Sequence, residues 1–181
     1  MNQAHAKIRG DMNNTRGALS NLLGLQIVKA WNVFGTRYLY FAAPGLESGP
    51  GDPWIQMECP WRIERGDEIV AGSDDYGQRA DDNTDPGWNP REEQTGHRQD
   101  QKLEEILGEA RAGCIFNTRG ELIVNGIEMD PLGGFRLSLS GGYTLSVFPA
   151  TASGIQWLVS LPHGSLSLMD GHLSGSLPSR D

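Results

Sequence analysis

Cysteine is scarce in this chain, because only Cys59 and Cys114 occur among 181 residues. Neither has a second cysteine three positions away, which excludes a zinc ribbon and a dithiol redox motif. One disulfide between the two is the only internal pairing that the composition leaves open. In a reducing compartment, two buried thiols are the expectation instead.

Long apolar runs are missing as well. No stretch approaches the roughly 20 residues that span a bilayer, and residues 1–17 lack the apolar segment of a secretory signal. These absences favour a cytoplasmic protein and disfavour a membrane protein. Glycine and proline, by contrast, interrupt the chain often, with 24 and 10 occurrences, and this favours many short strands over long helices.

Positive charge is in short supply: 15 Lys and Arg stand against 23 Asp and Glu, which gives a formal net charge of -8. An acidic surface repels phosphate backbones, so nucleic-acid binding is disfavoured. The same charge suits a basic protein partner, since complementary charge speeds the encounter. Acidic composition is common, so it permits such a partner without identifying one.

The common catalytic motifs are also absent: the chain contains no GxSxG, GxxxxGK[ST], GxGxxG or HExxH segment. The histidines lie in the tail and in loops, and the nine-residue spacing of His163 and His172 matches no common metal site. We therefore predict no catalytic residue, no metal and no cofactor. A binding protein is favoured, although missing motifs do not exclude an enzyme.

Alternating apolar residues predict strands in both halves of the chain. Segment 54–59 is the cleanest case, because Ile55, Met57 and Cys59 share one face. This pattern predicts that Cys59 is a core residue and not a nucleophile. The predicted strands cover 25–31, 36–41, 54–59, 62–65, 68–71, 115–116, 122–124, 135–139, 143–148, 155–161 and 166–169.

One principal helix is expected over residues 101–112, with Leu103, Ile106, Leu107 and Ala110 on one stripe and Gly113 as its stop. The predicted fold class is α+β, mainly antiparallel β, arranged as a sandwich or a partly open barrel.

Two stretches resemble each other, WIQMECP at 54–60 and YTLSVFP at 143–149. Each follows a strand of similar type, at 38–41 and at 135–139. This predicts two repeated β units, with chance similarity between short alternating strands as the alternative. In a true repeat Cys59 and Phe148 would be equivalent, each a buried apolar residue ahead of a strand-ending proline.

Composition also divides the chain. Residues 1–15 are polar and without periodicity, which predicts a loose N-terminal extension. Residues 16–181 are expected to form a single domain. Within it, residues 72–100 contain almost no aliphatic side chain, so a long polar surface loop is expected there.

Candidate binding residues flank or lie within that loop. Exposed tryptophan beside arginine is typical of protein interfaces, and Trp54 lies on the strand face opposite the core stripe. The predicted binding residues are Trp61, Arg62, Asp74, Asp75 and Trp88. In the alternative interpretation, the protein is a small-molecule binder or an enzyme. Its pocket would then lie at the mouth of the β structure, lined by Arg37, Glu58, Trp61 and Arg62.

The segments CPWRI (59–63) and LSGGYTLSVFP (139–149) carry a resemblance to a family of small uncharacterised bacterial proteins, over roughly residues 20–173. The resemblance brings no activity and no site residue with it. By association with small single-domain families of that kind, it implies an immunity-like or accessory protein that acts on a protein partner.

Residues 81–92 generate a first prediction, because they place oxygen side chains at positions 1, 3, 5 and 12 as a calcium loop does. Pro86 stands where the sharp turn needs glycine, and no predicted helix precedes the segment. We expect calorimetric titration to show no calcium binding tighter than about 0.1 mM. A tight stoichiometric signal that disappears in Asp85→Ala would contradict this.

Overall fold

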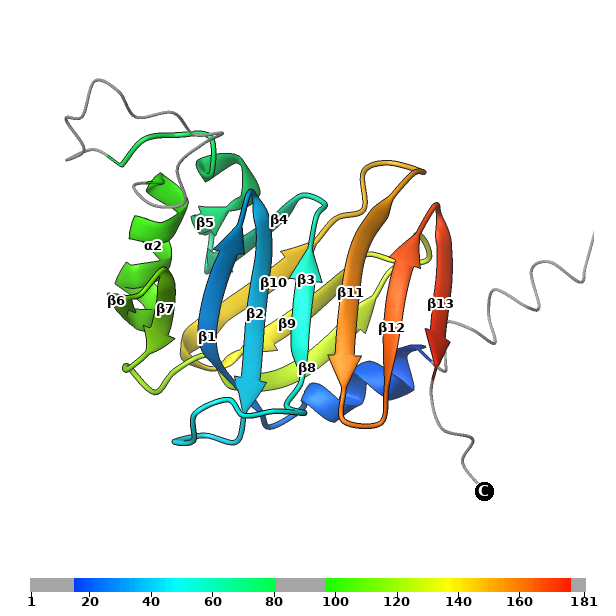
Figure 1. Cartoon of the computed structure of the whole chain (residues 1–181), viewed down its shortest axis with the longest axis horizontal. Coiled ribbons are helices and arrows are strands. Elements are labelled where there is room, and N and C mark those ends of the chain that lie inside the picture. The colour runs from blue at the N-terminus through cyan, green and yellow to red at the C-terminus, as the bar shows by residue number, and fades with distance from the viewer. Residues whose placement is uncertain (1–14, 81–96, 177–181) are drawn as a thin grey trace, which may run out of the picture.

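Two antiparallel sheets face each other in the computed structural model, which describes residues 15–80 and 97–176 (Figure 1). The sheets do not close into a barrel, so the arrangement is a sandwich, and the predicted α+β class with mainly antiparallel strands is confirmed. The larger sheet has eight strands in the order β13, β12, β11, β3, β2, β1, β7, β6, and the smaller has five in the order β5, β4, β10, β9, β8.

The strand bounds follow the predicted segments closely in the first half of the chain. The large sheet contains β1 (Gln26–Val33), β2 (Thr36–Ala42), β3 (Trp54–Met57), β6 (Gly108–Arg111), β7 (Cys114–Asn117), β11 (Ile155–Leu161), β12 (Gly164–Met169) and β13 (His172–Ser176). The small sheet contains β4 (Trp61–Arg65), β5 (Glu68–Gly72), β8 (Val124–Met129), β9 (Phe135–Leu139) and β10 (Tyr143–Val147).

The helical elements are short. Residues 15–19 are helical and lead into a 3₁₀ turn at Ser20–Leu22; two further 3₁₀ turns are Ser73–Asp75 and Ser140–Gly142. The longest helix among the described residues is α2 (Arg98–Leu107), which packs with Leu103, Ile106 and Leu107 buried.

The two predicted β units share one topology. Strands β1, β2 and β3 form a meander in the large sheet, after which the chain crosses to β4 and β5 in the small sheet. Strands β8, β9 and β10 form the matching meander in the small sheet, after which the chain crosses to β11 and β12 in the large one. Each unit therefore contributes strands to both sheets.

The side chains at the two crossings differ, however. Cys59 is 4% exposed, whereas Phe148 is 39% exposed. The expectation that both are buried is wrong for Phe148, because its ring lies outside the sandwich beneath the guanidinium of Arg62, 4.9 Å from the ring centroid. Phe148 instead continues the sheet through its backbone, whose N–H donates to the Pro60 carbonyl.

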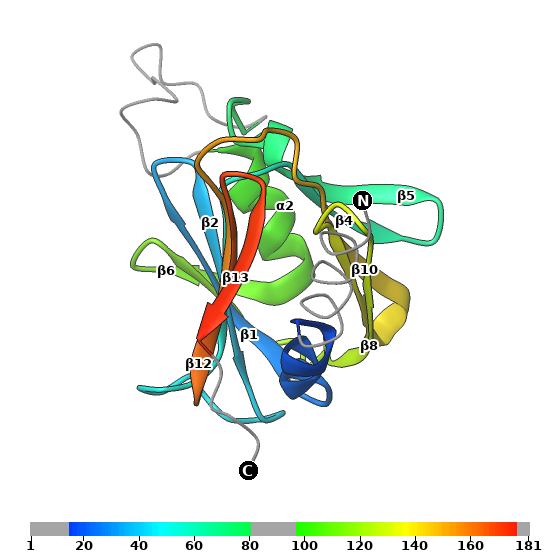
Figure 2. The ribbon, with the colours of Figure 1, turned by 90° about the vertical axis from the view of Figure 1, so that its right-hand side faces the viewer.

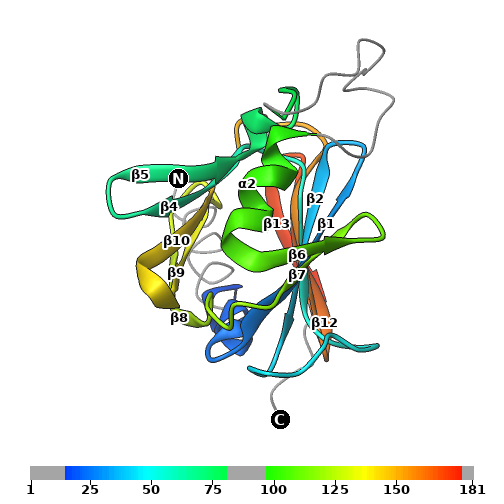
Figure 3. The same ribbon diagram turned by 90° about the vertical axis from the view of Figure 1, so that its left-hand side faces the viewer.

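Helix α2 and the small sheet lie on the same side of the large sheet (Figures 2 and 3). The apolar core fills the space between them, with Phe41, Ile55, Leu145 and Trp157 among its fully buried side chains. In the part of the chain that the structure describes, no helix and no second sheet covers the opposite face of the large sheet.

The predicted helix at 101–112 is wrong at both ends. It begins at Arg98 and stops at Leu107, because Gly108 takes φ 131°. A Cβ at Gly108 would lie 2.1 Å from Thr118 Oγ1, so only glycine fits. Ala110, expected on the buried stripe, is exposed in β6, and Gly113 belongs to the β6–β7 turn instead.

Two predicted boundaries also move. Thr15, placed in the loose extension, is helical and 4% exposed. The polar loop expected at 72–100 is shorter, since Gly72 ends β5 and α2 begins at Arg98. The segment 81–96, with the calcium-like residues and Trp88, lies outside the described residues, as do residues 1–14 and 177–181.

Cys59 lies where the alternation predicted, on the inward side with Ile55 and Met57, and both cysteines are free thiols. Burial raises the pKa of the Cys59 thiol to about 12. In the unfolded chain the same thiol ionises near pH 8.5. Folding therefore favours the neutral thiol, and this contribution to stability is complete below about pH 8.5 and is lost as the pH rises toward 12.

The burial of Cys59 leads to a second prediction. Native Cys59 should react slowly with a small thiol reagent, and Cys59→Ala should cost about 1 to 2 kcal/mol at pH 7. Between pH 8 and pH 10 the wild type should lose roughly 1 to 2 kcal/mol more than Cys59→Ala does, because only the wild type has this thiol to ionise on unfolding. Urea unfolding at the two pH values measures the difference, with Cys114→Ala as the control. Rapid native labelling of Cys59 would contradict the prediction.

Candidate functional site

The uncovered side of the large sheet carries a patch of rings in two adjacent rows. One row places Trp31 opposite Tyr38, and the next places Tyr40 opposite Trp54. Strand β7 extends the second row, since Phe116 pairs with Lys29, the neighbour of Tyr40. We name this patch the aromatic face, and its members are Lys29, Trp31, Tyr38, Tyr40, Trp54, Arg111 and Phe116.

The rings of the aromatic face contact one another across the strands. The centroids of Trp31 and Tyr38 are 5.8 Å apart, and those of Tyr38 and Trp54 are 5.9 Å apart. Both pairs are tilted, an arrangement in which aromatic side chains attract each other. Trp31 keeps 38% of its surface exposed, and the other rings are half-buried. The patch is therefore a continuous apolar surface that water still reaches.

Two cations lie over rings of this face. Lys29 Nζ is 3.9 Å from the Tyr40 ring centroid, and Arg111 Cζ is 4.4 Å from that of Phe116. Such contacts are electrostatically favourable and hold long side chains flat against the rings. Burial also raises the pKa of Tyr40, so its hydroxyl stays neutral and able to donate.

The rest of the same surface is more polar. Beyond Trp54 and Gln56 the rows continue through Ser160 and Leu158 of β11 into serines of β12 and β13, where the hydroxyl oxygens of Ser167 and Ser174 are 3.0 Å apart. The aromatic face thus borders a region in which serines predominate.

The outer face of the small sheet has a different character, because three of its charged side chains cluster together. Glu64 lies 2.8 Å from Arg62 Nε and 3.5 Å from Arg136 Nη2, and it accepts a hydrogen bond from the Ser146 hydroxyl at 3.2 Å. Charges that already pair within the molecule gain less from pairing with a partner. The two outer faces of the sandwich are therefore chemically distinct.

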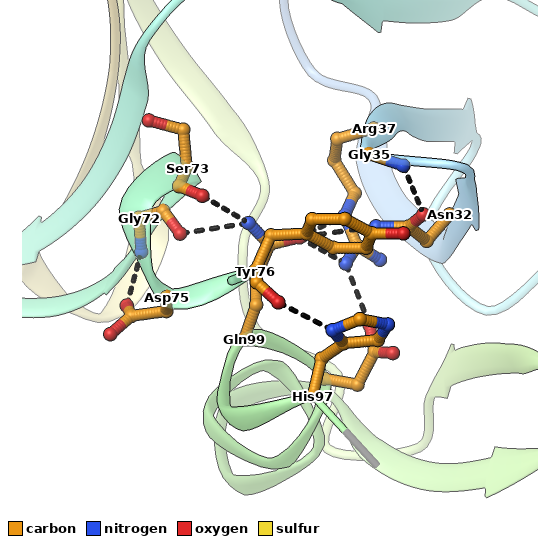
Figure 4. Close-up of polar contacts among 10 residues, drawn as sticks. Asn32, Gly35, Arg37, Gly72, Ser73, Asp75, Tyr76, His97 and Gln99 are labelled. Atoms are coloured by element: carbon orange, nitrogen blue, oxygen red, sulfur yellow. Dashed lines mark hydrogen bonds and ion pairs between the residues drawn. The ribbon is translucent and has the colours of Figure 1, made fainter. Parts of the chain in front are cut away.

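A buried polar cluster braces the end of the β1–β2 hairpin (Figure 4). Arg37 is 1% exposed, and its guanidinium donates to Gln99 Oε1 and to Asp100 Oδ1, the latter at 2.6 Å. Gln99 in turn donates to the Gly72 carbonyl at 2.8 Å. Burial lowers the pKa of Arg37, and the Asp100 carboxylate opposes this shift. The cluster joins β2, the end of β5 and the start of α2.

Tyr76 and His97 complete the cluster beside the hairpin. Their rings stack with centroids 4.0 Å apart, and His97 Nδ1 donates to the Tyr76 carbonyl. The Tyr76 ring also lies against Gly35, where an added Cβ would be 3.3 Å from Cε1. Burial raises the pKa of Tyr76, with the Asp100 carboxylate contributing in the same direction.

Several predicted binding residues have structural partners. Trp61 is 3% exposed, so the expectation that it is a surface anchor is wrong; the chain crosses to the small sheet after Pro60 and turns the indole into the core. Asp75 is 9% exposed and pairs with Lys102 at 2.7 Å. Arg62 stays partly exposed beside Glu64, and Asp74 is exposed. Trp88 lies outside the described residues.

The residues of the alternative pocket lie in separate environments. Arg37 and Trp61 are buried, while Glu58 is exposed and Arg62 lies on the outer face of the small sheet. Within the described residues, no three His, Cys, Asp or Glu side chains are placed to hold a metal ion. Nor does any described helix have the length and apolar character needed to cross a membrane.

Sequence reasoning found Trp54 on the outward face but missed Trp31, Tyr38 and Tyr40. The signal was present, because Tyr38 and Tyr40 alternate with Leu39 and Phe41 along β2. Arg37 obscured it, since it falls on the same side as Leu39 and Phe41, where a charge is not expected.

Comparison of the chain with protein-family models, with curated proteins and with solved structures gave no match. The resemblance carried by CPWRI and LSGGYTLSVFP therefore stays a prediction.

The polar cluster supplies a third prediction. Gln99→Leu should cost about 3 kcal/mol, because it removes an acceptor from a buried guanidinium and leaves the Gly72 carbonyl without its donor. Gln101→Leu, in the same helix at a half-buried position, is the matched control and should cost less than about 0.5 kcal/mol. Urea unfolding measures both variants. Equal costs for the two would show that the cluster does not brace the fold.

Proposed function

We propose that this protein acts by binding a protein partner through the aromatic face. The main observation behind the proposal is that the rings of Trp31, Tyr38 and Trp54 pack against one another on an uncovered sheet. Tryptophan and tyrosine contribute most of the binding energy in many interfaces, because they offer large area at a small cost in conformational entropy.

A basic partner fits this chain. The formal net charge is -8, and complementary charge accelerates association and fixes orientation. Lys29 and Arg111 keep their positive charge over the rings, so the attraction for a basic partner comes from the net negative charge of the molecule and not from the aromatic face itself. An immunity-like or accessory role, as the resemblance implies, would require only such a surface and no catalytic group.

The fourth prediction tests the aromatic face. A Trp31→Ser, Trp54→Ser double variant should lose binding, whereas Phe148→Ser should keep it. Phe148 is the matched control, because it is 39% exposed against 38% for Trp31 and lies beside the other sheet. Each protein is immobilised and exposed to lysate of the source organism. The captured protein is then identified, purified and titrated calorimetrically.

We expect an identified partner rich in Lys and Arg, bound equally by wild type and Phe148→Ser. The double variant should bind at least 30-fold more weakly, and the wild-type affinity should fall as salt rises. If the double variant unfolds, binding is measured with Trp31→Arg instead. The methylene groups of the arginine still pack against the neighbouring rings, and its charge repels a basic partner. A partner that binds all variants equally, or no partner at micromolar bait, would overturn the proposal.

A further inference from the structure

The tip of the β1–β2 hairpin carries an aromatic side chain that the fold disfavours. Phe34 takes φ 48° and is 65% exposed, and Gly35 follows at φ 90°. Two-residue turns of this kind prefer Asn-Gly, because a bulky residue is strained at positive φ. Neither local conformation nor burial explains a phenylalanine here. Residues with strained backbone conformations cluster at functional sites.

The tip is held rigidly in place. Asn32 Oδ1 accepts a hydrogen bond from the Gly35 N–H at 3.0 Å, and the Tyr76 ring covers Gly35. Arg37, two residues beyond the turn, is anchored to Gln99 and Asp100 (Figure 4). A side chain presented from a fixed backbone loses less conformational freedom on binding.

Phe34 lies at the end of the hairpin that carries part of the aromatic face. Val33 and Thr36 pair at the end of the hairpin, and Trp31 and Tyr38 form the second pair below them. At about 3.4 Å per residue, Phe34 lies roughly 10 Å along the strand from Trp31. It therefore lies beyond the end of the sheet, at the tip of the hairpin that carries Trp31 and Tyr38.

An exposed acid lies near the tip. Asp74 is exposed and precedes by two residues Tyr76, whose ring lies against Gly35. The chain as a whole carries a formal net charge of -8. A partner with Lys and Arg around its contact surface would therefore be attracted to this molecule.

Building on the proposed function, we infer that Phe34 is the anchor residue of the interface and inserts into an apolar pocket of the partner, rimmed by Lys and Arg. The aromatic face then lies against the surface next to that pocket. Asn32, Arg37, Tyr76 and Gln99 are positioning residues, which act by fixing the hairpin and need not touch the partner.

The fifth prediction uses the strain at this position. Phe34→Asn should raise the melting temperature by about 2 to 4 °C, because asparagine tolerates positive φ, and should weaken binding of the identified partner at least 30-fold. Leu132→Asn is the matched control. Leu132 lies in the β8–β9 connection, the equivalent place in the second unit, and is 83% exposed. This control should bind within 2-fold of wild type.

Photo-crosslinking locates the contact directly. The photoreactive residue p-benzoylphenylalanine is introduced at position 34, 54 or 132, and the protein is irradiated in lysate of the source organism. We expect one basic protein crosslinked from positions 34 and 54 and none from 132. Mass spectrometry should place the crosslink from position 34 among apolar residues of that protein.

The outcomes separate the two proposals. Crosslinking from position 54 alone, with Phe34→Asn binding as tightly as wild type, would overturn the role of Phe34 and leave the aromatic face standing. No crosslink from either position would overturn both. A crosslinked species composed of two copies of this chain would show self-association in place of a basic partner.

Discussion

The orientation of strand β2 requires the burial of a positive charge, the guanidinium of Arg37. Burying arginine is costly unless its donors are satisfied, and here Gln99 and Asp100 at the start of α2 satisfy them. Arg37, Leu39 and Phe41 alternate along β2 and therefore all point inward. A shift of one residue would exchange the two faces of the strand, so the exposure of Tyr38 and Tyr40 depends on this pairing between a strand and a helix.

The same pairing explains where sequence reasoning reached its limit. The alternation of apolar and polar residues identified most strands. At 54–59 it also predicted which side chains face the core, because no charged residue falls among the apolar positions there. At 36–41 a charge falls in the apolar stripe, and the residue that satisfies it, Gln99, is 62 positions away. No local pattern contains that information. Trp61 was misjudged for a similar reason, since its burial results from a crossing between sheets and not from its neighbours in sequence.

Two further differences have local causes. The helix expected to reach residue 112 ends at Leu107, because the close approach of Thr118 requires glycine at Gly108, and a contact ten residues away cannot be read from an apolar stripe. Strand β13 (HLSGS) was not predicted because it contains one aliphatic side chain and lies at the edge of the sheet.

The outer face was only partly predictable as well. Trp54 followed from the alternation of its own strand, whereas the contact between Trp31 and Tyr38 depends on the register between strands.

The exchange of strands between the two sheets affects how the chain is made. Strand β4, in the first half, pairs with β10, so that Trp61 lies opposite Val147. During synthesis, β4 therefore emerges with an open strand edge and keeps it until β10 has left the ribosome. Contacts this distant in sequence also slow folding. A nascent chain in this state is a natural client for chaperones, and a product of premature termination would retain an open sheet edge that promotes aggregation.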